Sequence, residues 1–267
     1  MVLDMQKAAA ALQASYAPRA DQYRRDDEIE VTTPHHRRLA TKLVQISSSF
    51  GRTISVLDVG CGTGRYFHCL RRVDRLVGMD ITAEMLAAAQ RPVNGHLISA
   101  NSVELIHGNV FFASFALHSF DLIYSFGMFG HGCPVTVEVC DKLHSWLAPG
   151  GCLLFDTIDV AGLHWPERLR KRIRKEVYAV APSRLKVMLD RRQNGMPFFG
   201  LTRRELEAIL GASRFSDFTV TSEVCQSPLW RGRHLECIAG SLPRPAEAGA
   251  TGAPQAIPSS KRAWADI

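Results

Sequence analysis

Residues 54–80, I-S-V-L-D-V-G-C-G-T-G-R-Y-F-H-C-L-R-R-V-D-R-L-V-G-M-D, decide the fold of this chain. The apolar, β-branched start predicts a buried strand. Gly60, Gly62 and Gly64 follow at alternate positions, and such a turn lets a ligand lie against the backbone. We predict a helix over 65–72 and a second strand over 76–79. Asp80 then stands at the tip of that strand, where a carboxylate can accept hydrogen bonds from a ribose diol.

The spacing of these glycines distinguishes between ligands. A dinucleotide site has the pattern G-x-G-x-x-G, whereas this chain has G-x-G-x-G with Asp58 two residues before the first glycine. A carboxylate at Asp58 would repel a pyrophosphate and attract an ammonium group. The pattern therefore favours a ligand with a ribose and an amino-acid end over NAD. The alternative is a tight strand–helix turn that binds nothing.

The two motifs D-V-G-C-G-T-G and G-M-D resemble those of class I S-adenosylmethionine (SAM)-dependent methyltransferases, of the type that acts on small molecules. F-D-L-I at 120–123 and L-A-P-G-G at 147–151 also match that family. The resemblance implies an α/β, Rossmann-like, doubly wound seven-stranded sheet. The sheet would be mostly parallel with an antiparallel last strand, and helices would cover both faces. The cofactor SAM would lie across the ends of strands one, two and four.

The resemblance also implies a set of cofactor-binding positions. One of them departs from the family: Asn109 stands where an Asp usually accepts a hydrogen bond from the adenine amino group. An amide oxygen can still accept that bond, so we expect weaker binding there. The implied positions are Tyr16, Tyr23, Asp58, Gly60, Gly62, Gly64, Asp80, Ile81, Met85, Asn109, Val110, Ser125 and Phe126.

The remaining chain divides into three regions. Residues 1–50 are expected to form N-terminal helices that act as a lid, with Thr33 as a helix cap before Pro34. Residues 51–241 are expected to form the methyltransferase domain that the resemblance implies, with a substrate-covering insertion at about 160–200. Residues 242–267 are rich in Pro, Ala, Gly and Ser and are expected to be a disordered tail. The adjacent His35 and His36 are interpreted as surface residues.

Further elements follow from periodicity and capping signals. Thr202 and Glu205 have the spacing of a capping box. Helices are predicted over 35–50, 82–90, 135–146 and 202–210, and strands over 103–106, 120–125, 152–156, 218–224 and 234–239.

Composition restricts the class of protein. The 267 residues are 46% hydrophobic, which supports a full core, and no apolar run of about 18 residues predicts a membrane span. Without a signal-peptide pattern, we expect a cytoplasmic protein. The seven cysteines form no C-x-x-C pair, which argues against zinc and against disulfides. The net charge of +6 permits an anionic partner.

The acceptor of the methyl group is not named by the sequence. His131, in a loop after the strand at 120–125, is the candidate general base or substrate contact, and no metal is expected. The preferred hypothesis is methyl transfer to an O or N atom of a small, partly apolar metabolite, mainly through positioning. A basic run at 168–175 is either a solvated helix face or a contact for an anionic acceptor. A tRNA methyltransferase and a non-catalytic SAM-binding module remain as alternatives, with a dehydrogenase a distant fourth.

Overall fold

A computed structural model describes residues 2–162, 199–227 and 231–240 of the chain. The basic run at 168–175, most of the predicted insertion and the predicted tail lie outside these residues. None of the helices in the described ranges is both long enough and apolar enough to cross a bilayer.

One seven-stranded sheet organises the described residues, with the strand order β3-β2-β1-β4-β5-β7-β6. All neighbouring strands are parallel except β7, which runs antiparallel to both β5 and β6. This topology confirms the predicted fold class. The strands are β1 (Ile54–Val59), β2 (Val73–Asp80), β3 (Ala100–His107), β4 (Phe120–Ser125), β5 (Leu147–Ile158), β6 (Phe218–Gln226) and β7 (Arg231–Gly240).

Helices cover both faces of the sheet. Leu39, Leu43 and Ile46 of α3 (Pro34–Ser49) pack on one face, together with Leu86 of α4 (Ala83–Ala89). The opposite face carries apolar side chains of α5 (Val137–Trp146) and α8 (Arg203–Ala212). The apolar side chains of these helices bury the central strands on both sides, and β4 is buried at every position.

Capping signals in the sequence form as predicted. Thr33 accepts a hydrogen bond from the backbone N–H of His36 at the start of α3. Thr202 and Glu205 form a full capping box at the start of α8. Each satisfies N–H groups that the helix itself leaves without a partner.

A buried ion-pair network ties α3 to β7. Glu236 is 1% exposed and its carboxylate lies 2.5 Å from the guanidinium of Arg38 and 2.7 Å from Nζ of Lys42. The two cations balance a carboxylate that burial would otherwise destabilise.

The predicted helix over 65–72 is wrong. The segment contains only a single 3-10 turn, η2 (Phe67–Cys69), and the chain then extends into β2. The backbone N–H of Arg71 donates to Oγ of Ser47 at 3.0 Å instead of continuing a helix. The contact with α3 therefore overrides local helix propensity. The second and third strands are also longer than the sequence predicted.

The surface assignment of His36 is wrong too. His36 is 3% exposed, because the start of α3 packs against the turn that contains Tyr66. His35 is half-buried and faces His234 across a ring distance of 5.6 Å.

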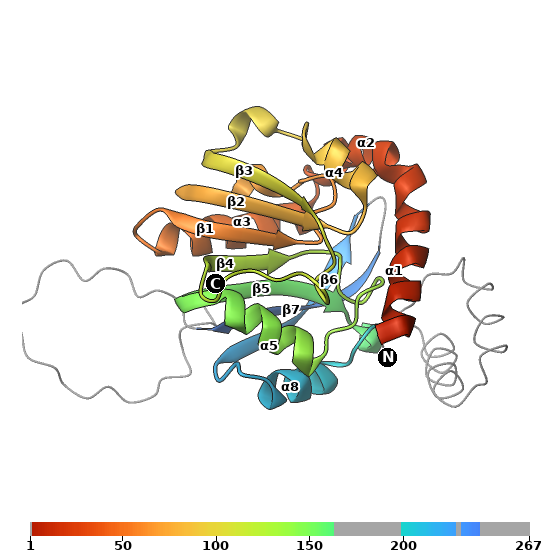
Figure 1. The fold of residues 1–267 in the computed structure, drawn as a ribbon, viewed down its shortest axis with the longest axis vertical. Helices are drawn as coiled ribbons and strands as arrows, with labels where there is room; N and C mark the ends of the chain where they lie inside the picture. The colour runs from red at the N-terminus through yellow and green to blue at the C-terminus, as the bar shows by residue number, and fades with distance from the viewer. Residues whose placement is uncertain (1, 163–198, 228–230, 241–267) are drawn as a thin grey trace, which may run out of the picture.

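The N-terminal helices α1 (Val2–Tyr16) and α2 (Ala20–Glu30) lie at the carboxyl edge of the parallel strands (Figure 1). Gln13 of α1 donates to the backbone carbonyl of Ile81, just after β2, at 2.6 Å. Leu12 packs against Gly132 in the loop after β4 so closely that a Cβ at Gly132 would lie 2.3 Å from it. The N-terminal helix thus spans the sheet edge from β2 to β4.

Candidate active site at the carboxyl edge of the sheet

The loops after β1, β2, β3 and β4 meet at one edge of the sheet. Parallel strands point their carboxyl ends the same way, and ligands of open α/β sheets bind there. The structure brings the predicted positions from Asp58 to Phe126 to this edge, because each stands at or just after a strand end. Tyr16 and Tyr23 reach it from the N-terminal helices.

The three glycines of the first loop have different roles. All have positive φ, at 75°, 54° and 76° for Gly60, Gly62 and Gly64. A Cβ at Gly60 would lie 2.7 Å from Met128, and one at Gly64 would lie 2.7 Å from Phe67. A Cβ at Gly62 would meet nothing within 4 Å. Gly62 is therefore the position where the backbone itself is open to a ligand, while its neighbours allow tight packing within the protein.

Asp80 joins the first loop to the start of α4. Its carboxylate accepts hydrogen bonds from the backbone N–H of Gly62 at 2.9 Å and from that of Thr82 at 2.8 Å. Burial raises the pKa of Asp80, and the N–H donors of Thr82 and Gly62 oppose that rise. Each carboxylate oxygen has lone pairs left, so the group can accept further hydrogen bonds from a ligand.

Asp58 lies beneath the loop and is 3% exposed. Burial raises its pKa to about 8, the hydroxyl of Tyr124 opposes the rise, and the nearby Asp80 adds to it. The positive charge of Arg65 opposes it as well. At pH 7 this carboxyl is mostly protonated, and a cationic ligand group beside it would favour its ionisation.

The aromatic side chains of the N-terminal helices lie against one another near Asp80. The rings of Tyr16 and Tyr23 are 5.7 Å apart, and Tyr23 is 38% exposed. Burial raises the pKa of Tyr16 above its usual range, and the charges of Tyr23 and Asp80 add to the rise. Both rings thus stand at the side of the site that faces solvent.

Asp27 is a site contact that sequence reasoning missed. It is 2% exposed on α2, accepts a hydrogen bond from the hydroxyl of Thr63, and lies 3.4 Å from the guanidinium of Arg65. Both partners belong to the glycine-rich loop. From the sequence alone, the charged run around residue 27 is interpreted as a solvated turn, because the partners of Asp27 are more than 30 residues away in the chain.

The residues predicted to flank an adenine ring occupy different environments. Ile81 is half-buried, and Met85 of α4 is 4% exposed. Asn109 is half-buried, and its Oδ1 accepts a hydrogen bond from the backbone N–H of Phe111 at 3.0 Å. Val110 packs in the core cluster that includes Val59.

The end of β4 supplies two buried positions. Ser125 is fully buried, and its hydroxyl has no hydrogen-bond partner within the described residues. Phe126 is 8% exposed and packs edge-on against Tyr66 at a ring distance of 4.9 Å. A buried hydroxyl of this kind is available to a polar group that enters the site.

A cluster of three histidines surrounds Asp156 at the carboxyl end of β5. Asp156 accepts a hydrogen bond from the backbone N–H of Gly127 at 2.7 Å, and its other oxygen lies 2.7 Å from Nδ1 of His234. The ring of His234 is 5.6 Å from that of His35 and 6.2 Å from that of His131. We refer to His35, His131 and His234 with Asp156 as the histidine cluster. His131, the predicted base, is half-buried at its outer side.

The charge state of this cluster follows from burial and pairing. Burial alone would raise the pKa of Asp156, but His234 and the N–H of Gly127 outweigh it, and the pKa lies below its usual value. An ionised carboxylate beside an imidazole fixes the orientation of that ring. His234 could not be linked to Asp156 from the sequence, because they are 78 residues apart and lie on strands that pair only in the fold.

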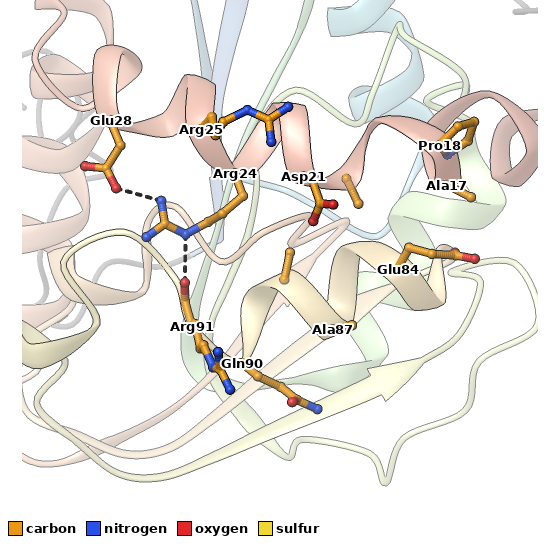
Figure 2. Close-up of a pocket in the computed structure, with 12 residues that line it drawn as sticks. Ala17, Pro18, Asp21, Arg24, Arg25, Glu28, Glu84, Ala87, Gln90 and Arg91 are labelled. Atoms are coloured by element: carbon orange, nitrogen blue, oxygen red, sulfur yellow. Dashed lines mark hydrogen bonds and ion pairs between the residues drawn. The ribbon is translucent and has the colours of Figure 1, made fainter.

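A groove of about 730 Å³ lies between α2 and α4, outside the glycine-rich loop (Figure 2). Arg24 at its wall donates to the backbone carbonyl of Arg91 at 2.7 Å and pairs with Glu28. None of the predicted site residues lines it. Its contacts anchor α2 to the end of the helix that follows Asp80.

A family model described as a methyltransferase domain matches residues 56–151. The match runs from within β1 to the start of β5, so the glycine-rich loop, Asp80 and His131 all lie within the residues that resemble a methyltransferase domain.

Curated relatives support the same family. A malonyl-[acyl-carrier protein] O-methyltransferase of Halalkalibacterium halodurans is 29% identical over 132 aligned residues, and the match covers 45% of this chain and 47% of the relative. A demethylmenaquinone methyltransferase of Oceanobacillus iheyensis is 28% identical over 102 aligned residues, and the match covers 36% of this chain and 41% of the relative. The chain thus spans less than half the length of either relative that it matches.

Solved structures share the fold. A magnesium protoporphyrin IX methyltransferase from Synechocystis, with bound SAH (S-adenosylhomocysteine), has a TM-score of 0.56 at 16% identity. The match covers 88% of this chain and 100% of that one. The shared fold is the one that the resemblance of the sequence motifs implied.

Proposed function

We propose that this chain is a SAM-dependent methyltransferase that transfers a methyl group to an O or N atom of a small, partly apolar acceptor by in-line displacement. The observation that carries the proposal is the pairing of Asp80 with the open glycine loop. The half-buried carboxylate of Asp80 at the tip of β2 accepts the N–H of Gly62, at the loop position where the backbone has free space. This arrangement suits a ribose laid against bare backbone.

The residues at the edge fit the chemical groups of SAM. Asp80 has acceptor capacity for the ribose hydroxyls, and Asp58 suits the ammonium group of the amino-acid end. Ile81 and Met85 offer apolar surface for the adenine ring. The side-chain amide of Asn109 can accept a hydrogen bond from the adenine amino group. When bound, SAM supplies a methyl group already activated by the sulfonium.

The protein's own part is to position the acceptor and exclude water. Tyr16 and Tyr23 stand over the solvent-facing side near Asp80, and Phe126 closes the inner side. Alignment of two reactants in this way can supply much of the acceleration. We therefore assign α1 and α2 the role of a lid.

A proton leaves the acceptor atom as the new bond to carbon forms, and the histidine cluster is placed to accept it. We assign that step to His131, which is half-buried in the loop after β4. Asp156 and His234 act as positioning residues behind it, since their contact at 2.7 Å holds one imidazole in a fixed orientation. SAH, the methylated acceptor and one proton are the products.

The names of the curated relatives favour a small acceptor over an RNA. One is named for O-methylation of malonyl-[acyl-carrier protein] and the other for demethylmenaquinone. The net charge of +6 leaves room for an acceptor that carries a carboxylate or a phosphate.

Isotope transfer tests the proposal. The purified chain is incubated with methyl-labelled SAM and separate pools of carboxylic thioesters, phenols and quinols, amines, and tRNA. We expect label in one small-molecule pool and loss of that label in Asp80→Ala. Label only in tRNA would replace the proposal with the RNA-modifying alternative. Binding of SAM with no transfer to any pool would favour a non-catalytic module.

The role of His131 has its own readout. His131→Ala should lower turnover more than SAH affinity, while His96→Ala, a change at an exposed histidine away from the site, should change neither. Equal turnover in His131→Ala would remove His131 from the mechanism.

A further inference from the structure

A second group of metal-ligand side chains lies behind the glycine-rich loop, away from the histidine cluster. His36 comes from the first turn of α3, and His68 and Cys69 come from η2. Nε2 of His68 is 3.5 Å from Sγ of Cys69, and Nε2 of His36 is 4.0 Å from the same sulfur. The three ligand atoms all lie within 4.8 Å of one another.

These separations are close to those around a tetrahedral metal ion. With Zn–S of about 2.3 Å and Zn–N of about 2.0–2.1 Å, a sulfur and a nitrogen on one zinc are about 3.6 Å apart, and two nitrogens about 3.3 Å. The observed distances from Sγ to the two Nε2 atoms are 3.5 and 4.0 Å. Movements of about an ångström would bring all three atoms to bonding distance of one ion.

The surroundings suit a neutral-imidazole, thiolate site. Burial lowers the pKa of His36 to about 3 and lowers that of His68, so both rings keep a nitrogen lone pair at pH 7. Burial raises the pKa of the Cys69 thiol to about 12, so binding must displace a proton from it. His68 is only half-buried and gives an entry path for an ion.

Asn94 lies next to His68 and is the candidate for a fourth protein ligand. Its Nδ2 lies 3.3 Å from Nε2 of His68, and rotation of the side-chain amide would present Oδ1 instead. Asn94 has a positive φ of 56°, which a turn fixes in place. Either this oxygen or a water can complete four-coordination, as in other sites with three protein ligands.

We propose that His36, His68 and Cys69 bind one thiophilic divalent cation of the Zn²⁺ class, with Asn94 or a water as the fourth ligand. The histidine cluster around Asp156 is a weaker candidate, because both carboxylate oxygens of Asp156 already have partners within the protein, the backbone N–H of Gly127 and Nδ1 of His234. From the sequence we expected no zinc, because the chain has no C-x-x-C pair. A site whose ligands come from both α3 and η2 leaves no such pattern in the sequence.

The ion would stabilise the segment that packs behind the glycine-rich loop. The ring of His36 stacks on Tyr66 at 4.6 Å, and Tyr66 packs edge-on against Phe126 at 4.9 Å. Fixing His36 to η2 therefore fixes the aromatic wall next to the strand that carries the site. This role is additional to the proposed methyl transfer and does not depend on it.

Cobalt substitution tests the site directly. The full chain is stripped with a chelator and titrated with Co²⁺ alone, without SAM or acceptor. We expect a thiolate-to-cobalt charge-transfer band in the near ultraviolet and intense visible bands of a four-coordinate ion, both saturating at one equivalent. Cys69→Ala should lose the charge-transfer band. Cys140→Ala, a matched change at a buried cysteine in α5, should retain it.

His68→Gln provides a second variant at a half-buried position, in case Cys69→Ala unfolds. It should weaken Co²⁺ binding by about tenfold or more. Zn²⁺ should raise the unfolding temperature of the parent chain and of Cys140→Ala but not that of Cys69→Ala. A charge-transfer band that is absent from the parent chain, or that persists in Cys69→Ala, overturns the proposal. Because the readout needs no methyl transfer, failure of the proposed function would leave this result unaffected.

Discussion

Binding of the cofactor should displace a proton from Asp58. The carboxyl is 3% exposed, and burial raises its pKa to about 8, so it is mostly neutral in the free protein at pH 7. The ammonium group of SAM or SAH beside it would favour the ionised form. The bound complex then holds a carboxylate where the free protein holds a carboxylic acid, and the proton goes to the buffer.

The size of the effect follows from the pKa of about 8. About 0.9 of the molecules carry this proton at pH 7, so binding should release about 0.9 proton. The apparent affinity at pH 7 should be about tenfold below that of the ionised form, which is about 1.4 kcal/mol. Affinity therefore rises nearly tenfold from pH 6 to pH 7. Above about pH 8 it falls again, since an α-amino group itself loses its proton near there.

Titration calorimetry with SAH measures the proton release. The observed heat is compared at pH 7 in buffers with different ionisation enthalpies, and the slope gives the number of protons. Asp58→Asn should release none and should lose the rise in affinity between pH 6 and pH 7. Asp121→Asn is the matched control: Asp121 is also buried but pairs with Arg52 at the amino end of β4, so the release should be unchanged.

Two results would refute the reasoning. The first is heat of binding that is the same in all buffers at pH 7, with affinity flat from pH 6 to pH 7. The second is full proton release by Asp58→Asn, which would assign the proton to another group.

Three further substitutions have definite expected outcomes. Asp80→Ala should weaken SAH binding by about 1–3 kcal/mol, since a half-buried hydrogen-bond acceptor is lost; unchanged affinity by calorimetry would remove Asp80 from the site. Glu236→Gln leaves Arg38 and Lys42 without their carboxylate and should lower the free energy of unfolding by about 2 kcal/mol, discounted for the partial exposure of Arg38. Urea denaturation checks this, and a loss below about 0.5 kcal/mol would contradict it. Thr202→Ala removes the capping box of α8 and should cost about 1 kcal/mol in thermal unfolding; no change would mean that the cap contributes nothing.

The parts of the site that the sequence predicted are local in the chain. Asp58, the three glycines and Asp80 lie within one strand–turn–strand unit, and alternate glycines after a β-branched run restrict the backbone strongly. The seven-stranded, mostly parallel sheet with its antiparallel last strand came from the family resemblance, and the fold confirms it.

The parts that the sequence missed depend on contacts between distant segments. Asp27 reaches Thr63 and Arg65 only because α2 packs on the glycine-rich loop. His234 meets Asp156 only through pairing of β7 with β5. No periodicity or short spacing encodes such pairs.

The helix expected over 65–72 failed for a related reason. Its sequence is compatible with a helix, but Ser47 of α3 takes the backbone N–H of Arg71, and β2 must begin at Val73 to pair with β1. Tertiary contacts decided the conformation of a segment whose own preference is weak. The burial of His36 against Tyr66 has the same origin.

The central claim is that the carboxyl edge of this sheet holds a nucleoside with a charged amino-acid end. Parallel calorimetric titrations of the folded chain with SAH and with NAD test it most directly. We expect one saturable site for SAH and no heat from NAD at the same concentrations. Absence of binding by SAH, or equal binding of NAD, would contradict it.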